Sequence, residues 1–182
     1  KDGDIITKEF KDNVKIIDED ITLYANTAIN YPDSNKVILM GDVRMYENSD
    51  SLTCKELWLY KGDNERYEAI GDVILFKQNK EIKANNLTYY KNNNIEAVNN
   101  ISIKDSTKLI MGDTLFINYN NSLLNNIEIN SNAKLLNTRN IQLSKYKNKK
   151  KLQDKMESSN MFIQFKPDET IEFIDLSGMA IA

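Results

Sequence analysis

The stretch AIGDVILFKQNKEIKANNLTYYKNNN, residues 69–94, repeats a pattern already present in LMGDVRMYENSDSLTCKELWLYKGDN, residues 39–64. Both stretches contain Gly-Asp-Val, then a short polar break, and then a closing Leu-x-Leu or Leu-x-aromatic segment. Repetition with a period of about 20 to 50 residues indicates a fold assembled from one unit that stacks on its own copies. The architecture of the whole chain can therefore be worked out from this unit.

Two columns of apolar residues align across the copies. The first column begins at Val43, Val73, Ile101, Ala133 and Met179, and the second begins at Leu57, Leu87, Leu115 and Met161. Apolar side chains alternate with other residues in both columns, which indicates β-strands because successive side chains point to opposite faces. Residues 25–31 align with residues 54–60 as an earlier copy.

Short polar segments rich in Asn, Asp, Gly and Ser separate the columns, and these residues favour turns. Such short breaks favour antiparallel neighbours over crossover helices. Gly41 and Gly71 precede the first-column strands, and we expect a bulge or a close backbone approach there. The sequence therefore predicts an all-β fold of repeated antiparallel strands.

A lysine-rich insertion, at about residues 137–156, interrupts the repeat between Ala133 and Met161. Among its lysines are Lys147, Lys149, Lys150 and Lys151. A solvated loop between strands is the favoured interpretation. The alternative is an electrostatic contact with phosphates or with an acidic partner.

The aligned columns place one consistently apolar face along the strands. We expect the following side chains to point inward: Val43, Met45, Leu57, Leu59, Val73, Leu75, Leu87, Tyr89, Ile101, Ile103, Leu115 and Ile117. The opposite face is mixed, with Arg44, Thr88 and Ser102 among its members. The inward side chains could fill a sandwich core about 10 Å thick, or they could line an apolar cleft that takes acyl chains. Periodicity favours the core and leaves the cleft open.

Composition removes several classes of function. The chain has 182 residues and a formal net charge of −3, which argues against a dedicated nucleic-acid-binding protein. It contains no histidine, so Ser-His-Asp and Cys-His nucleophiles and histidine metal sites are excluded. A carboxylate-based enzyme stays possible, with the 18–20 cluster as a weak candidate, but we expect no catalytic residue, no metal and no cofactor.

Two further features bear on where the chain works. The single cysteine, Cys54, excludes an intramolecular disulfide, and its alignment with Ala84 and Gly112 predicts a small buried group. No apolar run approaches the roughly 20 residues of a transmembrane helix, so we expect no membrane span in this chain.

The repeat resembles the OstA-like family, the lipopolysaccharide-transport proteins typified by LptA, LptC and the periplasmic part of LptD. The family pattern is a Gly-Asn/Asp-Val step, an alternating strand, a polar turn, a small residue and a Leu-x-Leu/Tyr-Tyr close. It stands here at Gly41-Asp42-Val43 with residues 54–60, at Gly71-Asp72-Val73 with residues 84–90, and more weakly at residues 99–101 with Gly112 and Leu115. Residues 21–136 match best, while the insertion and residues 157–182 depart from the pattern.

The resemblance implies a fold and a function. The fold is a twisted β-jelly roll, open along one seam, formed by residues 1–182 as a single domain. The implied function is to shield the acyl chains of lipopolysaccharide in the periplasm on the way to the outer membrane, without chemistry. The implied partners are lipopolysaccharide, or a related lipid, and other OstA-like modules that associate through edge strands.

Two other functions remain open at this point. One is a structural β-solenoid or jelly-roll module with a filled core, which binds a protein partner through its edge strands. The other is a surface adhesin or a carbohydrate-active β-helix with carboxylate chemistry.

Overall fold

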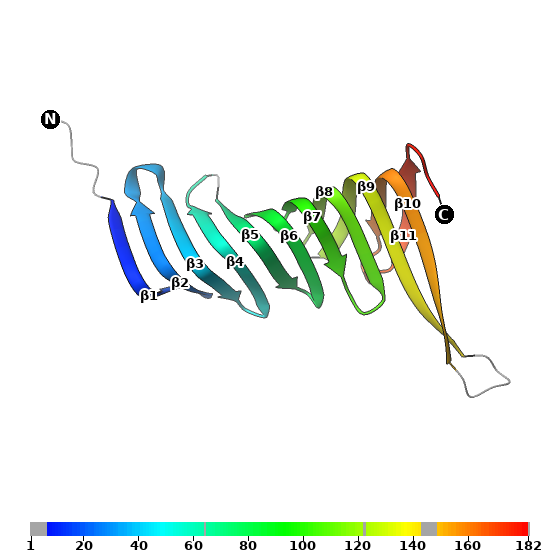
Figure 1. Cartoon of the computed structure of the whole chain (residues 1–182), viewed down its shortest axis with the longest axis horizontal. Coiled ribbons are helices and arrows are strands. Elements are labelled where there is room, and N and C mark those ends of the chain that lie inside the picture. The colour runs from blue at the N-terminus through cyan, green and yellow to red at the C-terminus, as the bar shows by residue number, and fades with distance from the viewer. Residues whose placement is uncertain (1–6, 64, 122, 143–148, 182) are drawn as a thin grey trace.

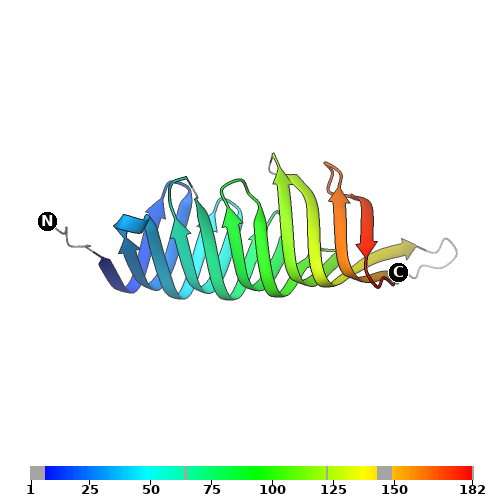
Figure 2. The same ribbon diagram turned by 90° about the horizontal axis from the view of Figure 1, so that it is seen from above.

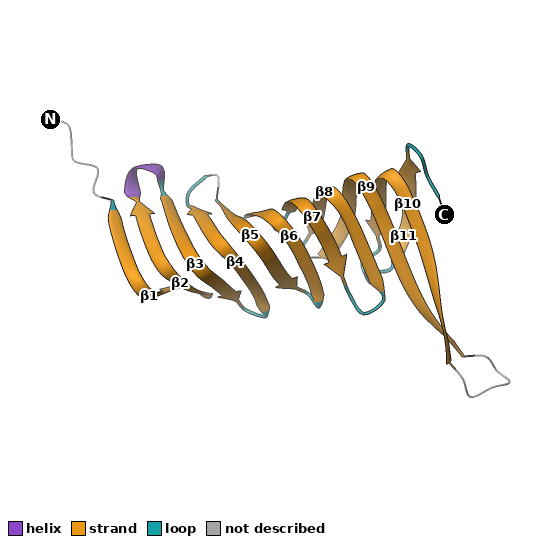
Figure 3. Cartoon of the chain, in the orientation of Figure 1, coloured by secondary structure: helices purple, strands orange, loops and turns teal. Residues whose placement is uncertain are grey.

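The computed structural model describes residues 7–63, 65–121, 123–142 and 149–181, and the side chains of residues 139–142 and 149–152 lie outside the description. The strands form one antiparallel sheet whose spatial order is the order of the sequence (Figure 3). Their bounds are β1 Lys8–Asp18, β2 Ile21–Tyr31, β3 Lys36–Glu47, β4 Asp50–Tyr60, β5 Arg66–Lys77, β6 Lys80–Tyr90, β7 Ile95–Lys104, β8 Lys108–Asn120, β9 Leu123–Gln142, β10 Lys149–Phe165 and β11 Ile171–Ser177. The prediction of an all-β, antiparallel fold is confirmed.

The sheet is long and bent. Strands β1 to β11 succeed one another along the longest axis, so β1 lies at one end of the molecule and β11 at the other (Figure 1). Seen from above, the strands curve, and the sheet folds over its own inner face (Figure 2). One short 3₁₀ turn, Pro32–Ser34, joins β2 to β3.

A pair of left-handed residues bends every second strand. The pairs are Asp12-Asn13 in β1, Gly41-Asp42 in β3, Gly71-Asp72 in β5, Asn99-Asn100 in β7 and Ser131-Asn132 in β9. The register with the adjacent strands shifts at each pair, which identifies a β-bulge. Gly, Asn and Asp reach positive φ more readily than other residues, so the repeated motif marks the corner of the sheet.

The bulge prediction at Gly41 and Gly71 is confirmed, but the strands do not begin after these glycines. β3 runs through Gly41, and β5 runs through Gly71. The two halves of each strand pair with the same neighbouring strands on both sides of the corner. A bulge therefore turns one strand into two legs instead of ending it.

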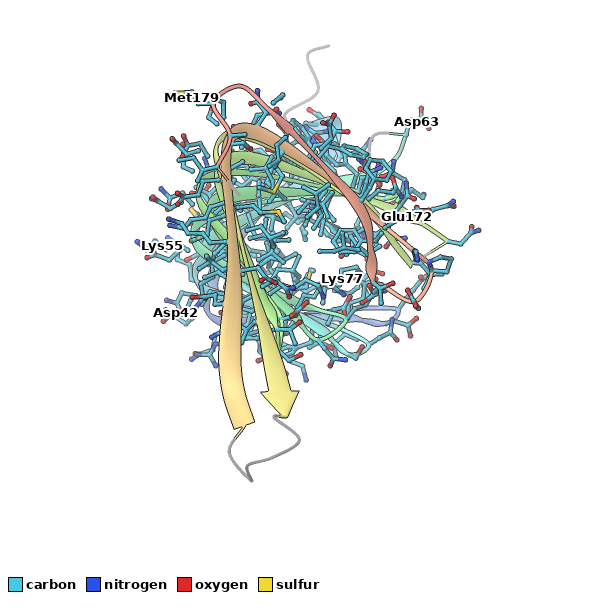
Figure 4. All side chains as sticks on the ribbon, turned by 90° about the vertical axis from the view of Figure 1, so that its right-hand side faces the viewer. Asp42, Lys55, Asp63, Lys77, Glu172 and Met179 are labelled. Carbon is cyan, nitrogen blue, oxygen red and sulfur yellow. The ribbon has the colours of Figure 1, made fainter. Side chains whose placement is uncertain are left out.

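Each corner divides a strand into two halves. We call the halves that lead to turns 19–20, 48–49, 78–79 and 105–107 the first leg. The halves that lead to turns 32–35, 91–94 and 166–170 are called the second leg. Viewed along the long axis, Asp42 and Lys55 lie on the corner side, while Lys77 and Asp63 lie away from it (Figure 4). The inner faces of the two legs supply one continuous apolar cluster. Each fully buried aliphatic side chain contributes about 1.5–3 kcal/mol to stability.

Small side chains face the bulges from the next strand. Cys54 is 7% exposed, and burial raises the pKa of its thiol to about 12, so the prediction of a small buried group is confirmed. Gly112 holds the same position in β8, and a Cβ there would lie only 2.2 Å from Cγ2 of Ile129. The close approach of β9 at its bulge explains why this position takes a glycine.

The predicted loop in the lysine-rich insertion is wrong for residues 137–142 and 149–156, which extend β9 and β10. Their register continues unbroken from Leu136↔Lys155 to Gln142↔Lys149. Because the added residues lengthen two antiparallel neighbours together, the ladder keeps its register and projects as a hairpin (Figure 1). Residues 143–148 lie outside the described residues.

The last repeat is also shifted by one position from its predicted alignment. Met179 is 89% exposed and does not point inward. It follows Gly178, whose φ is +86°, and a bridge joins Ile181 to Glu157 of β10. By position, the pair Gly178-Met179 therefore corresponds to Gly41-Asp42 in β3, but only Gly178 of this pair has a positive φ.

The assignment of the two faces can be tested by paired substitutions in β6. Leu87 is 2% exposed, and Leu87→Asp should lower the free energy of unfolding by about 4 kcal/mol because the carboxylate would be buried without a partner. Thr88 points outward between Glu68 and Glu96 of the adjacent strands, so Thr88→Lys should change stability by less than about 0.5 kcal/mol. Urea unfolding followed by circular dichroism measures both, and equal losses at the two positions would contradict this assignment.

Candidate functional site

The space between the two legs, here called the trough, opens to solvent along a seam between the two rows of turns. A hollow of about 610 Å³ lies in the half nearer β1. Its walls include the apolar inner residues Ile21, Leu23, Met45 and Leu59. Its rim is mainly acidic and consists of Asp18, Glu19, Asp20, Glu47, Glu65, Lys61 and Lys91.

A second hollow, of about 260 Å³, lies in the half nearer β11. Its apolar walls are Ile103, Ile110, Leu124, Ile127 and Phe165. Its rim carries two lysines, Lys80 and Lys108, beside Asp105, Asp168 and Glu169. The two ends of the trough thus differ in the charge of their rims.

The middle of the trough is filled. The free volume there is about 10 Å³, at the lower limit for one water molecule. Tyr67 of β5 and Tyr89 of β6 stack with ring centroids 6.0 Å apart. Lys77 Nζ donates to Asp50 Oδ2 at 2.7 Å and to the Tyr89 hydroxyl at 3.1 Å. The Tyr89 hydroxyl in turn donates to Asn93 Oδ1 at 2.5 Å, so the network spans the seam.

The Lys77 network contains one unusual group. The Tyr119 ring lies 5.7 Å from Lys77 Nζ, and the residue is 9% exposed. Its hydroxyl has no hydrogen-bond partner among the described residues. Burial raises the pKa of Tyr119, with the nearby charges of Glu169 and Asp50 adding to the effect. A buried donor without an acceptor costs about 1–3 kcal/mol.

Among the residues that the structure describes, two ion pairs join the rows of turns across the seam. Lys61 Nζ lies 2.6 Å from Asp18 Oδ2, but both side chains are more than half exposed, and such pairs contribute little to stability. Lys80 Nζ lies 2.6 Å from Glu169 Oε2, and the Lys80 side chain is only 9% exposed. The second pair closes the seam beside the hollow nearer β11.

The structure places the predicted inward residues on the inner face of the trough. Val43, Met45, Leu57, Leu59, Val73, Leu75, Leu87, Ile101, Ile103, Leu115 and Ile117 are buried, and Tyr89 is half-buried. A contact with lipid stays a prediction for all of them. Lys147, and the side chains of Lys149, Lys150 and Lys151, lie outside the described residues.

The sequence alignment missed half of the inner face. The missed residues lie on one half of strands whose other half the sequence pattern predicts. Four of them, at most 3% exposed, are Leu39, Leu52, Ile82 and Ile95. Their signal was present: the alternation Val37-x-Leu39 stands before Gly41-Asp42, and Leu52-x-Cys54 stands before Lys55. It was lost because the bulge shifts the period-two pattern at each corner.

The carboxylates of the 18–20 cluster, and Asp72 of the repeated Gly-Asp-Val motif, are accounted for by structural contacts. Asp18 pairs with Lys61, and Glu19 and Asp20 form the β1–β2 turn. Asp72 lies at the corner and pairs with Lys55 at 2.7 Å. Among the described residues, no group of three potential ligands is placed to hold a metal ion. Nor does this part of the chain contain a helix long and apolar enough to span a membrane.

A solved structure shares this fold. LptH from Pseudomonas aeruginosa, the LptA homologous periplasmic component of the lipopolysaccharide transport device, superposes with a TM-score of 0.55 at 12% sequence identity. The match covers 74% of this chain and 92% of that chain. No family model matches the sequence, and no curated protein matches it. The likeness establishes the LptA-type β-jelly-roll fold for this chain.

The packing in the middle of the trough can be tested through the titration of Tyr67. Burial raises the pKa of this phenol from 10.0 to about 12, and the negative charge of Glu47 adds to the effect. The folded state favours the neutral phenol, so this group's contribution to stability is full below pH 10 and declines as the pH rises toward 12. Difference absorbance at 295 nm between the protein and Tyr67→Phe should show no tyrosinate near pH 10 until denaturant is added. A signal near pH 10 in the folded protein would refute the packed middle.

Proposed function

We propose that this chain is a non-enzymatic carrier that shields the acyl chains of lipopolysaccharide, or of a related lipid, in the trough. The observation that carries the proposal is the continuous apolar inner face, which widens into hollows of about 610 and 260 Å³ on either side of the packed middle. Acyl chains gain about 0.8 kcal/mol for each methylene that leaves water. This gain would hold a lipid in the trough without any chemical step.

The fold shared with LptH supports this proposal, because LptH is a component of a lipopolysaccharide transport device. By extension, we assign residues 1–182 to one OstA-like domain that works in the periplasm. The twelve inward residues predicted from the sequence would contact the lipid. Other modules of the same fold would receive it.

The packed middle determines how a lipid would enter. An acyl chain longer than either hollow has to displace the Tyr67–Tyr89 stack or push the legs apart. The corner bulges, the apolar packing between the inner faces and the contacts across the seam fix the angle between the legs, since each strand otherwise pairs within its own leg. Opening at the corner therefore costs no ladder hydrogen bonds.

A structural interaction module is the second candidate, and the packed middle favours it. In that case the exposed edges of β1 and β11 would bind a protein partner by strand addition. The inner face would then serve stability alone.

Photo-crosslinking distinguishes the two candidates. A photoreactive residue at Met45 or Leu59, which line the larger hollow, should label added lipopolysaccharide. The same residue at the sequence neighbour Arg44 points outward and should label it weakly or not at all. Equal labelling at Met45 and Arg44 would refute the trough as the binding site and leave the interaction module.

Association through the β1 end can be tested at Phe10. This side chain faces inward opposite Ala28 but is 54% exposed, because none of the described strands covers the outer side of β1. Phe10→Lys should weaken self-association, since the apolar end of the trough is what a second copy would cover. Sedimentation velocity over a range of concentrations measures this, with Glu9→Lys on the outer face as the control. A strictly monomeric wild-type chain would exclude the end-to-end arrangement.

A further inference from the structure

The hairpin that joins β5 to β6 ends in two lysines on the inner face. Lys77 and Lys80 pair directly across a two-residue turn. Gln78 and Asn79 both have positive φ, as a type I′ turn requires. Leu75 and Ile82, two residues away on the same strands, are buried, so both lysines point into the trough by the period-two rule.

This arrangement is electrostatically unfavourable unless anions accompany it. Cβ atoms of directly opposite residues are about 5 Å apart, and like charges at such positions destabilise a sheet. The side chains of Lys77 and Lys80 are only 11% and 9% exposed. Water therefore screens the repulsion poorly, and each ammonium group depends on a nearby carboxylate.

The carboxylates come from outside the hairpin. Asp50 begins the adjacent strand β4 and binds Lys77 at 2.7 Å. Glu169 binds Lys80 at 2.6 Å from a turn 89 residues away in the sequence. Glu169 itself has a positive φ of 61° and a side chain that is 34% exposed. It reaches the lysine from the solvent side, so its carboxylate can leave without crossing the core.

We propose that Lys77, Lys80 and the Tyr119 hydroxyl form a binding site for the phosphomonoester headgroup of an amphiphile held in the trough, and that the phosphate replaces Glu169 on Lys80. The inference rests on the proposed function. A phosphomonoester carries a charge of about −1.5 to −2 at neutral pH, so it offers Lys80 more negative charge than the single carboxylate of Glu169 does, while Asp50 stays on Lys77. It also supplies an acceptor for the buried Tyr119 hydroxyl.

The surroundings of the lysines suit a molecule with a charged head and an apolar tail. Lys80 lines the 260 Å³ hollow together with Ile103 and Phe165. Lys77 borders the packed middle together with Leu87. A headgroup at the lysines would thus lie at the seam with its tail in the hollow, and loss of the Lys80–Glu169 pair would free the seam at that point.

The preceding hairpin carries the opposite charge at the corresponding positions. Its corresponding closing residues are Glu47 and Asp50, which also pair across a two-residue turn. The rim of the 610 Å³ hollow, which includes Glu47, is mainly acidic. An anionic head would be repelled by that rim, whereas at Lys80 it could take the place of Glu169, so the seam would orient the amphiphile along the trough.

The test uses dodecyl phosphate, the neutral dodecyl maltoside and inorganic phosphate, each titrated below micelle formation by isothermal calorimetry. Dodecyl phosphate should bind more tightly than dodecyl maltoside, and inorganic phosphate should bind weakly. Lys80→Met should reduce affinity for dodecyl phosphate about tenfold, the loss expected for one charge-assisted hydrogen bond. Lys104→Met, at an exposed lysine of the next hairpin, is the matched control and should leave it unchanged.

Two variants separate a binding role from a structural one. Glu169→Gln removes the competing anion and should tighten dodecyl phosphate binding severalfold, whereas a purely structural pair predicts weaker or unchanged binding. Tyr119→Phe deletes a hydroxyl without a described partner, so it should weaken binding of dodecyl phosphate without lowering thermal stability.

The outcomes also separate this site from the proposed function. If neither amphiphile binds, the carrier function fails. If both bind equally and Lys80→Met affects neither, the carrier function stands and the headgroup site is refuted. If inorganic phosphate binds as tightly as dodecyl phosphate, the site takes free phosphate, and the headgroup assignment is overturned.

Discussion

The structure depends on one backbone constraint, the pair of left-handed residues at the corner of every second strand. A flat meander of these strands would leave the apolar face of the sheet exposed to solvent. The bulges turn the two legs toward each other, so one sheet provides both walls of its own apolar interior. Gly, Asn, Asp and Ser supply the required φ values in different copies. The corner, and not a particular residue, is therefore what the repeat preserves.

The sequence predicted the strands, their antiparallel order and much of the inner face, because period-two alternation and turn residues are local signals. It placed Val43, Leu57 and Leu87 on the buried side, where the structure has them. The corner could not be predicted, because a bulge interrupts the period-two alternation in the same way as the end of a strand. For that reason the sequence pattern did not assign Leu39 and Leu52 to the inner face. The β9–β10 extension was read as a loop because lysines obscure alternation.

The candidate site combines local and distant information in a similar way. The hairpin with Lys77 and Lys80 is visible in the sequence, but Glu169 and Tyr119 reach it only through the folding of the sheet. Acidic closing residues in one hairpin and basic ones in the next give the seam a charge gradient in a chain of small net charge. That gradient distinguishes the two hollows that lie on either side of the packed middle.

The simple meander has a consequence for biogenesis. Each strand finds its hydrogen-bonding partners in the strands made just before and just after it. A nascent or translocating chain can thus acquire structure progressively from its amino-terminal end, without waiting for remote segments. The Lys80–Glu169 contact is different, because its members are 89 residues apart. It forms only after β10 and β11 have docked, and the seam stays loose until the chain is nearly complete.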